Sequence, residues 1–232
     1  MNSPVPPHPA RPASPRAAVI ARAAELIDGQ GAERVIRVGV DGVNGAGKTI
    51  FADELAGALR ARGRDVLRAS IDDFHQPSAI RYRLGRNSPD GYFLDSFNYV
   101  GLREALLTPL GPGGSGLYRT GIFDLQTDRA LLSPVQQADP DSVLVFDGVF
   151  LHCPELRRSW EFSIFLDVGF EVSVARIVAR DGLDAADPQA PENRRYVEGR
   201  KRYLAECKPR DRANLVIANT DVAAPSIVTE RA

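Results

Sequence analysis

The chain has 232 residues, of which 44% are apolar and 25% are charged, a composition that suits an ordinary globular protein with one good-sized core. Its formal net charge of −1 excludes a general electrostatic attraction to nucleic acid or to an anionic membrane. The two cysteines, Cys153 and Cys207, lack metal-ligand spacing, which predicts reduced thiols in a cytoplasmic protein. We therefore expect one α/β domain that has no nucleic-acid or membrane partner.

The first segment of the chain differs in composition from the rest. Residues 1–16 contain six prolines and no apolar run, which predicts a flexible leader rather than a signal peptide or a membrane span. The following residues, from Ala17, carry apolar side chains at helical spacing, and this helix is expected to end at Gly29 or Gly31. Residues 17–232 are expected to form a single domain.

Residues 42–49 read G-V-N-G-A-G-K-T and match the phosphate-binding loop pattern in full. In such a loop the glycines let backbone N–H groups turn toward the β-phosphate, the lysine reaches the β and γ oxygens, and the last hydroxyl binds magnesium. The pattern predicts a site for ATP or GTP with Mg²⁺. The candidate donor-binding residues are Gly42, Asn44, Gly45, Ala46, Gly47, Lys48 and Thr49.

The flanking segments give this loop the required context. Residues 34–41 read R-V-I-R-V-G-V-D, which is dense enough in valine and isoleucine for a buried parallel strand. Residues 49–62 carry apolar side chains at helical spacing and many good helix formers. The order strand, loop, helix aims the positive end of a helix dipole at the phosphates.

Two further strands are predicted to end in acidic residues. Residues 65–72 form a short strand that ends at Asp72, and a carboxylate at this edge of a parallel sheet is a candidate general base for phosphoryl transfer. The alternative is that Asp72 only initiates a turn or caps a helix. Residues 142–150 read S-V-L-V-F-D-G-V-F, in which Asp147 is a candidate magnesium ligand beside Thr49. Residues 161–167 supply another strand of the parallel core.

The segment after that strand is rich in arginine. Residues 170–181 predict a helix with Arg176 and Arg180 on one stripe, although charged helix faces are usually only solvated. Residues 182–195 are polar and marked by prolines, and we interpret them as a mobile lid that carries Arg194 and Arg195. Arginines on a lid would neutralise the transferring phosphoryl group and help to exclude water. A helix is expected to resume at Tyr196.

A glycine-rich stretch precedes alternating side chains within residues 110–128. We interpret this segment as a hairpin flap over the acceptor, with a simple edge hairpin as the alternative. Together the elements predict a three-layer α/β/α fold with a parallel central sheet, a helical lid and a small β-hairpin flap.

Over residues 35–221 the chain resembles the uridine kinase family of P-loop kinases, whose relatives act on pantothenate, phosphoribulose and other small hydroxyl compounds. The resemblance rests on five segments, namely G-V-N-G-A-G-K-T, S-I-D-D-F-H, S-P-D-G-Y-F-L-D-S-F-N-Y, F-D-G-V-F and A-R-I-V-A-R-D. It implies that Asp72 deprotonates the acceptor, that Asp147 stands where the family has a metal-site Glu, and that Arg176 and Arg180 match the lid-helix arginines.

The acceptor side departs from the family pattern. His75 stands where the nucleoside kinases usually carry a Tyr, and either binds the acceptor or packs. Asp90 and Asp95 are the two candidates for gripping the acceptor hydroxyls. The family position suggests that Tyr118 borders the acceptor and that Arg119 or Asp124 hydrogen-bonds it. The candidate acceptor-binding residues are Asp72, His75, Asp95, Tyr118, Arg119, Arg176 and Arg195.

The resemblance implies an ATP-dependent kinase, and the first candidate acceptor is the 5′-hydroxyl of uridine or cytidine. Pantothenate, a sugar or a sugar phosphate is the alternative. A GTPase switch is disfavoured because the chain lacks the N-K-x-D segment, and an ATP-driven motor is disfavoured by length and charge. The sequence does not indicate an oligomeric state.

Overall fold

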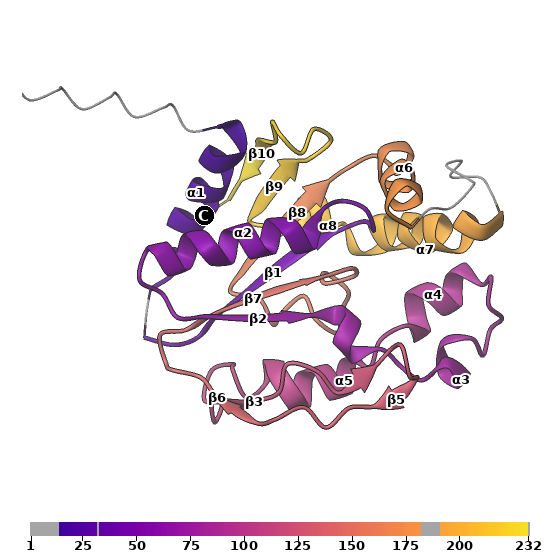
Figure 1. Cartoon of the computed structure of the whole chain (residues 1–232), viewed down its shortest axis with the longest axis horizontal. Coiled ribbons are helices and arrows are strands. Elements are labelled where there is room, and N and C mark those ends of the chain that lie inside the picture. The colour runs from indigo at the N-terminus through magenta and orange to yellow at the C-terminus, as the bar shows by residue number, and fades with distance from the viewer. Residues whose placement is uncertain (1–13, 32, 182–190, 232) are drawn as a thin grey trace, which may run out of the picture.

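The computed structural model describes residues 14–31, 33–181 and 191–231. Its centre is a six-stranded sheet in the order β10-β9-β8-β1-β7-β2, parallel except for β10 (Figure 1). This arrangement confirms the predicted α/β class with a mainly parallel central sheet. The strands of the sheet are β1 (Ile36–Gly42), β2 (Val66–Ser70), β7 (Val143–Gly148), β8 (Phe162–Asp167), β9 (Leu215–Ala218) and β10 (Ser226–Glu230).

Helices cover both faces of the sheet, and the strand sequences explain why. Every residue of β1 and of β7 is buried, so these strands carry apolar side chains on both faces. Val38 and Val40 pack with Phe51 and Leu55 under one helical layer, whereas Phe146 belongs to the cluster on the opposite face. The three-layer arrangement follows from this two-sided burial.

The first helical layer consists of α1 (Pro15–Asp28) and α2 (Lys48–Ala61), which lie on the same side of the sheet in Figure 1. Helix α1 begins two residues before the expected Ala17, because the Ser14 side chain accepts a hydrogen bond from the Ala17 backbone N–H and caps the helix. Proline at the first helical position suits that start.

The remaining helices lie on the other face of the sheet or at the carboxyl edge of its strands (Figure 1). Helix α7 begins at Pro191 rather than at the expected Tyr196, so Arg194 and Arg195 lie within a helix and not on a loop. The segment 182–190, which holds most of the predicted lid, and residues 1–13 of the predicted leader fall outside the described residues. These helical elements are η1 (Ile71–Phe74), α3 (Ser78–Arg81), α4 (Pro89–Asp95), α5 (Tyr99–Leu102), η2 (Arg103–Leu107), α6 (Phe170–Asp181), α7 (Pro191–Cys207) and α8 (Pro209–Arg212).

The segment expected to form one hairpin flap forms two short strand pairs instead. Strand β3 (Leu117–Tyr118) pairs with β6 (Gln136–Gln137), and β4 (Phe123–Asp124) pairs with β5 (Arg129–Ala130). The pairing extends beyond residue 128 because β6 closes back on β3. The Asp124 carboxylate accepts hydrogen bonds from Gln126 N and from the Thr127 hydroxyl, so it shapes the turn between β4 and β5. Among the described residues, no helix is long and apolar enough to cross a membrane.

Candidate active site

The phosphate loop leaves β1 at Gly42 and enters α2 at Lys48, and its conformation depends on glycine. Gly45 and Gly47 have φ values of 75° and 86°, in the left-handed region. A Cβ on Gly45 would lie 2.3 Å from the carbonyl oxygen of Ser173, the residue of α6 that covers the loop. The loop is therefore closely packed as well as left-handed, and a side chain at Gly45 would force the loop away from α6.

Two side chains hold the loop in this shape. Asn219, just after β9, donates from Nδ2 to the Ala46 carbonyl at 2.7 Å. Arg176 of α6 donates to the Gly45 carbonyl at 3.3 Å and to the carbonyls of Asn219 and Thr220 at 3.0 and 2.7 Å. These bonds occupy the carbonyls on the outer side of the loop and so orient the loop rigidly toward the site. Arg176 thus contacts the donor loop directly, while its predicted role toward the transferring phosphoryl group stays a prediction.

Lys48 lies at the centre of the charged groups of the site. Its Nζ donates to the Val43 carbonyl at 3.0 Å. Burial, followed by the positive charge of Arg200, lowers the pKa of Lys48 to about 8, while the carboxylates of Asp41, Asp72 and Asp147 oppose that shift. A bound anion would therefore raise the pKa of Lys48 again and hold the lysine in its charged form.

The two predicted magnesium ligands contact each other. The Thr49 hydroxyl donates to Asp147 Oδ2 at 2.8 Å, and Asp147 is only 2% exposed. Arg68 of β2, which the sequence did not single out, donates to Asp147 Oδ1 at 2.9 Å. Among the described residues no group of three or more His, Cys, Asp or Glu could hold a metal. A hydroxyl and one carboxylate suit Mg²⁺ that takes its other ligands from water and phosphate oxygens.

Asp72 lies on η1, immediately beyond β2, in a group of negative charges. The cap of η1 is Ser70, whose hydroxyl accepts from the Asp72 backbone N–H at 3.4 Å, so the capping role considered for Asp72 belongs to Ser70. Partial burial, followed by the charges of Asp72 and Asp147, raises the pKa of Asp73. The Asp72 side chain is exposed, and its negative charge acts on Lys48.

His75 is fixed beside Asp72. Its Nδ1 donates to the Asp72 carbonyl at 2.8 Å, and its ring packs on Phe97 with the centroids 4.6 Å apart. Burial lowers the pKa of His75, which favours the neutral ring. Both roles considered for His75 remain consistent with this position, since the ring packs and also stands next to the proposed base.

Several predicted acceptor residues lie elsewhere or are already paired. Tyr118 is buried and its hydroxyl donates to Gln136 at 3.1 Å. Its pKa is raised by burial and by Asp65, a carboxylate that precedes β2, whereas Asp72 follows that strand. Tyr118 therefore lies toward the opposite end of β2 from the base, which Figure 1 shows for β3 and β6. That Tyr118 borders the acceptor stays a prediction, although in this structure its hydroxyl is already bound to Gln136.

The carboxylate candidates are also engaged. Asp95 is buried, and both of its oxygens accept from Arg83 at 2.6 and 2.9 Å. Asp90 pairs with Arg202 of α7 at 2.7 Å on the surface. Arg119 is half-buried, and its backbone N–H donates to the Ala105 carbonyl. None of these three contacts reaches Asp72 or the phosphate loop.

Helix α7 brings basic side chains toward the loop. Arg195 donates to the Arg86 carbonyl, and its guanidinium stands over Tyr82, Tyr92 and Tyr196 at 5.2, 5.6 and 5.1 Å from the ring centroids. Arg180 lies in the last turn of α6 and is exposed.

Arg200 is the functional candidate that sequence reasoning missed. It is 1% exposed, and among the described residues none of its three guanidinium nitrogens has a hydrogen-bond partner. The guanidinium stands over the Tyr196 ring at 5.9 Å from its centroid, but this contact does not replace the missing hydrogen bonds. Burying such a cation next to Lys48 is costly unless an anion arrives to share it. The helical spacing of the sequence contained a signal for this residue. Arg200 lies on the buried stripe of α7 that also contains Val197, Tyr203 and Cys207, and an arginine at a position where an apolar residue is expected could have been singled out.

The fold and this arrangement define a P-loop mononucleotide-binding protein. No family model matches the chain. The chain is 26% identical over 183 residues to a phosphoribulokinase from Synechocystis sp.. This alignment covers 74% of the chain and 52% of that enzyme, so the chain spans about half the length of this relative. It is 23% identical over 192 residues to a uridine kinase from Lactobacillus helveticus, covering 74% of this chain and 84% of that protein.

Among solved structures, one described as a possible uridine kinase from Bacillus stearothermophilus shares the fold with a TM-score of 0.67 and 23% identity. The alignment covers 85% of this chain and 96% of that one. These comparisons agree with the sequence resemblance, since the chain is similar in sequence to uridine kinases and to a phosphoribulokinase and shares the fold of a possible uridine kinase.

Proposed function

We propose that this chain is an ATP-dependent kinase that transfers the γ-phosphoryl group to a hydroxyl of a small metabolite, with the 5′-hydroxyl of uridine or cytidine as the first acceptor to test. The observation that carries the proposal is the grouping around Lys48. Asp72 and Asp147 act on the charge of Lys48 from two strand ends, and Arg200 acts on it from α7. The proposed donor site, base and neutralising cations would thereby share one edge of the sheet.

The donor side would work by orientation and charge. Backbone N–H groups from Gly45 to Thr49 and the amino end of α2 would face the β-phosphate. The Lys48 ammonium would reach the β and γ oxygens, and Thr49 with Asp147 would hold Mg²⁺. When bound, Mg²⁺ supplies charge neutralisation to the β and γ oxygens. GTP is the alternative donor.

On the acceptor side, Asp72 would accept the proton. As the acceptor oxygen forms its bond to the γ-phosphorus, its proton passes to the Asp72 carboxylate and the bond to the β-γ bridging oxygen breaks, which leaves ADP. The hydrogen bond from His75 to the Asp72 carbonyl would keep the turn of η1 in place. Arg176, Arg180, Arg195 and Arg200 are the cations proposed to neutralise the moving charge.

The identity of the acceptor rests on the family alone. The relatives are named for different acceptors, uridine and phosphoribulose. We keep pantothenate, sugars and sugar phosphates as alternatives, and we propose the cytoplasm as the compartment because both cysteines are buried free thiols.

A coupled assay of ADP release tests the proposal directly. The full chain is incubated with ATP and Mg²⁺ and with uridine, cytidine, pantothenate, sugars or sugar phosphates in turn. We expect one class of acceptor to raise ADP release well above the rate measured without an acceptor. Lys48→Met should abolish that increase. The kinase proposal fails if no acceptor changes the rate of ATP turnover.

A further inference from the structure

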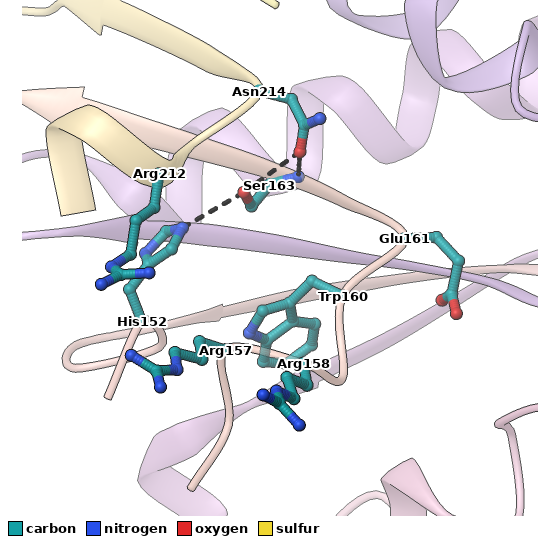
Figure 2. Close-up of a pocket in the computed structure, with 8 residues that line it drawn as sticks. All are labelled: His152, Arg157, Arg158, Trp160, Glu161, Ser163, Arg212 and Asn214. Atoms are coloured by element: carbon teal, nitrogen blue, oxygen red, sulfur yellow. Dashed lines mark hydrogen bonds between the residues drawn. The ribbon is translucent and has the colours of Figure 1, made fainter. Parts of the chain in front are cut away.

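A cavity lies on the sheet face opposite α1 and α2. It has a volume of about 500 Å³, within the range of small-molecule sites, and it is lined by His152, Arg157, Arg158, Trp160, Glu161, Ser163, Arg212 and Asn214 (Figure 2). Phe162 and Ile164 of β8 point into the core under α1 and α2, so Ser163 between them points into this cavity. None of these residues belongs to the proposed kinase site.

The cavity carries an uncompensated positive charge. The exposed side chains of Arg157, Arg158 and Arg212 line it, and among the described residues none of the three forms an ion pair, although Arg212 donates from Nε to the Cys207 carbonyl at 2.8 Å. The one carboxylate in the lining, Glu161, is held by Arg37 through bonds of 2.7 and 2.9 Å and does not neutralise them. Three guanidiniums without carboxylate partners attract an anion, and guanidinium groups favour phosphate oxygens.

One wall of the cavity is a fixed aromatic surface. Trp160 donates from Nε1 to the Leu151 carbonyl at 2.9 Å and stacks on Phe146 with the centroids 5.4 Å apart. It lies so close to β1 that a Cβ on Gly39 would be 2.9 Å from the indole ring. The indole is therefore a rigid aromatic surface in a lining that is otherwise mostly polar, and it would receive the organic part of a phosphate ester beside the cations.

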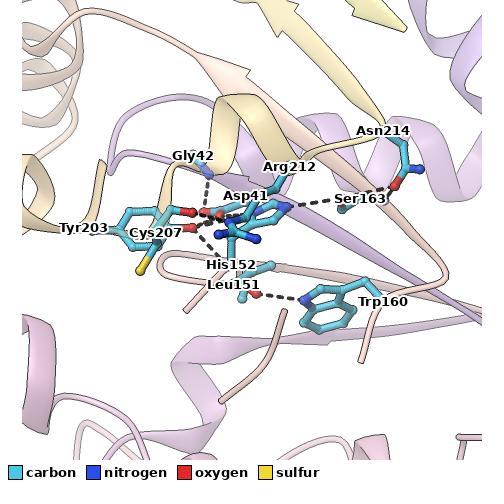
Figure 3. Close-up of polar contacts among 10 residues, drawn as sticks. All are labelled: Asp41, Gly42, Leu151, His152, Trp160, Ser163, Tyr203, Cys207, Arg212 and Asn214. Carbon is cyan, nitrogen blue, oxygen red and sulfur yellow. Dashed lines mark hydrogen bonds and ion pairs between the residues drawn. The ribbon is translucent and has the colours of Figure 1, made fainter. Parts of the chain in front are cut away.

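The opposite wall is polar and leads to the phosphate loop (Figure 3). His152 is 3% exposed and connects the cavity to the strand end that precedes the phosphate loop. Its Nε2 is 3.1 Å from the Ser163 hydroxyl oxygen, and its Nδ1 is 2.7 Å from Asp41 Oδ2. The other oxygen of Asp41 accepts from the Gly42 backbone N–H at 2.7 Å. Asp41 also accepts a hydrogen bond from the hydroxyl of Tyr203. Tyr203 belongs to α7 and follows Arg200 by about one helical turn.

We propose that this cavity is a binding site for a small phosphate ester, and that its occupancy changes the affinity of the phosphate loop for ATP through Ser163, His152 and Asp41. The phosphate group contacts Arg157, Arg158 and Arg212, and the organic part lies on Trp160. An anion that meets the Ser163 hydroxyl competes with His152 for it, and His152 is a direct partner of the carboxylate that holds Gly42.

Trp160 is the only tryptophan of the chain, so its fluorescence reports this cavity alone. The experiment titrates Lys48→Ala, in which the donor site is impaired, with inorganic phosphate, with uridine monophosphate and with ribose 5-phosphate. We expect a saturable change in fluorescence with the two esters and a much weaker one with inorganic phosphate. Equal affinity for inorganic phosphate would assign the site to the free ion, and would overturn the part of the proposal that concerns an ester.

The cations are tested by substitution. Arg157→Gln/Arg158→Gln/Arg212→Gln should weaken ester binding by at least about tenfold, because three charged contacts are lost. Arg103→Gln, which removes an equally exposed arginine of η2, should leave the affinity unchanged. The proposal is overturned if no saturable change occurs, or if the triple variant binds as well as its parent.

The link to the loop is tested with the wild-type protein. The dissociation constant for ATP is measured by calorimetry with and without a saturating ester, and linkage requires the reciprocal change in ester affinity when ATP is bound. Ser163→Ala should retain ester binding and lose the effect on ATP, while Ser133→Ala, on a surface loop, should retain both. Ester binding that leaves the ATP affinity unchanged would overturn the coupling.

Discussion

The donor side and the acceptor side of the proposed site differ in what holds their residues in place. On the donor side the backbone is fixed, since Asn219 and Arg176 bind loop carbonyls and Gly45 packs against α6. On the acceptor side the side chains mostly bind one another, as Asp95 does with Arg83. A pre-organised backbone can bind a triphosphate without rearranging. Side chains that are paired with one another must first give up those partners before they can bind an acceptor, which costs free energy.

The largest expected effect comes from a substitution of Asp72, which should impair the acceptor side and leave the donor side intact. Asp72→Asn should lower turnover by about a hundredfold or more, because the acceptor proton loses its base. The affinity for ATP should stay near that of the wild type, because the loop contacts do not involve Asp72. Steady-state turnover and ATP calorimetry on the same preparation check this prediction, and Asp73→Asn is the matched control. Full turnover in Asp72→Asn would remove Asp72 from the mechanism.

The second effect concerns the pH dependence of the donor side. The pKa of Lys48 is lowered to about 8 from 10.5, so the unfolded chain binds this proton more readily than the folded protein between those two pKa values. Without ligand, this group makes the protein more stable as the pH rises from 8 to 10.5. ATP favours the charged lysine, so its affinity should fall as the pH rises above about 8.

Calorimetric titration of ATP at several pH values on either side of that pKa measures the loss of affinity, which approaches tenfold per pH unit where one proton is taken up on binding. Lys48→Met should bind ATP weakly with no such slope. An unchanged slope in Lys48→Met would show that another group titrates.

The third effect comes from a substitution of Arg200, which should raise the stability of the ligand-free protein and lower its affinity for ATP. Arg200→Met removes a buried cation without hydrogen-bond partners, which should stabilise the ligand-free protein by about 1–3 kcal/mol. The same change should weaken ATP binding by about tenfold, because a charge-assisted hydrogen bond to phosphate is lost. Thermal unfolding with and without ATP measures both quantities. Lys201→Met, on the exposed side of α7, is the control, and a destabilised Arg200→Met would contradict the absence of hydrogen-bond partners for Arg200.

The same comparison explains how far the sequence could predict this molecule. The strand, loop and helix around Gly42, and the contact between Thr49 and Asp147, depend on local patterns and on strand ends, both of which are visible in the sequence. Arg68 and Arg200 were missed because their contacts cross from distant elements, to Asp147 and toward Lys48 respectively. The flap was misplaced because its pairing partner, β6, has no apolar alternation, so its register depends on tertiary packing.

The smallest expected effect tests the acceptor side at Tyr118. Tyr118→Phe should leave turnover and the acceptor KM within about twofold of wild type, because the hydroxyl bonds to Gln136 and the ring lies toward the end of β2 away from Asp72. The loss of that hydrogen bond should cost about 0.5–1.5 kcal/mol of stability. His75→Phe, which keeps the packing on Phe97 but removes the bond to the Asp72 carbonyl, should change turnover more than Tyr118→Phe does. If instead Tyr118→Phe raises the acceptor KM strongly and His75→Phe does not, the acceptor reaches the β3–β6 pair, and the acceptor side extends along the full length of β2.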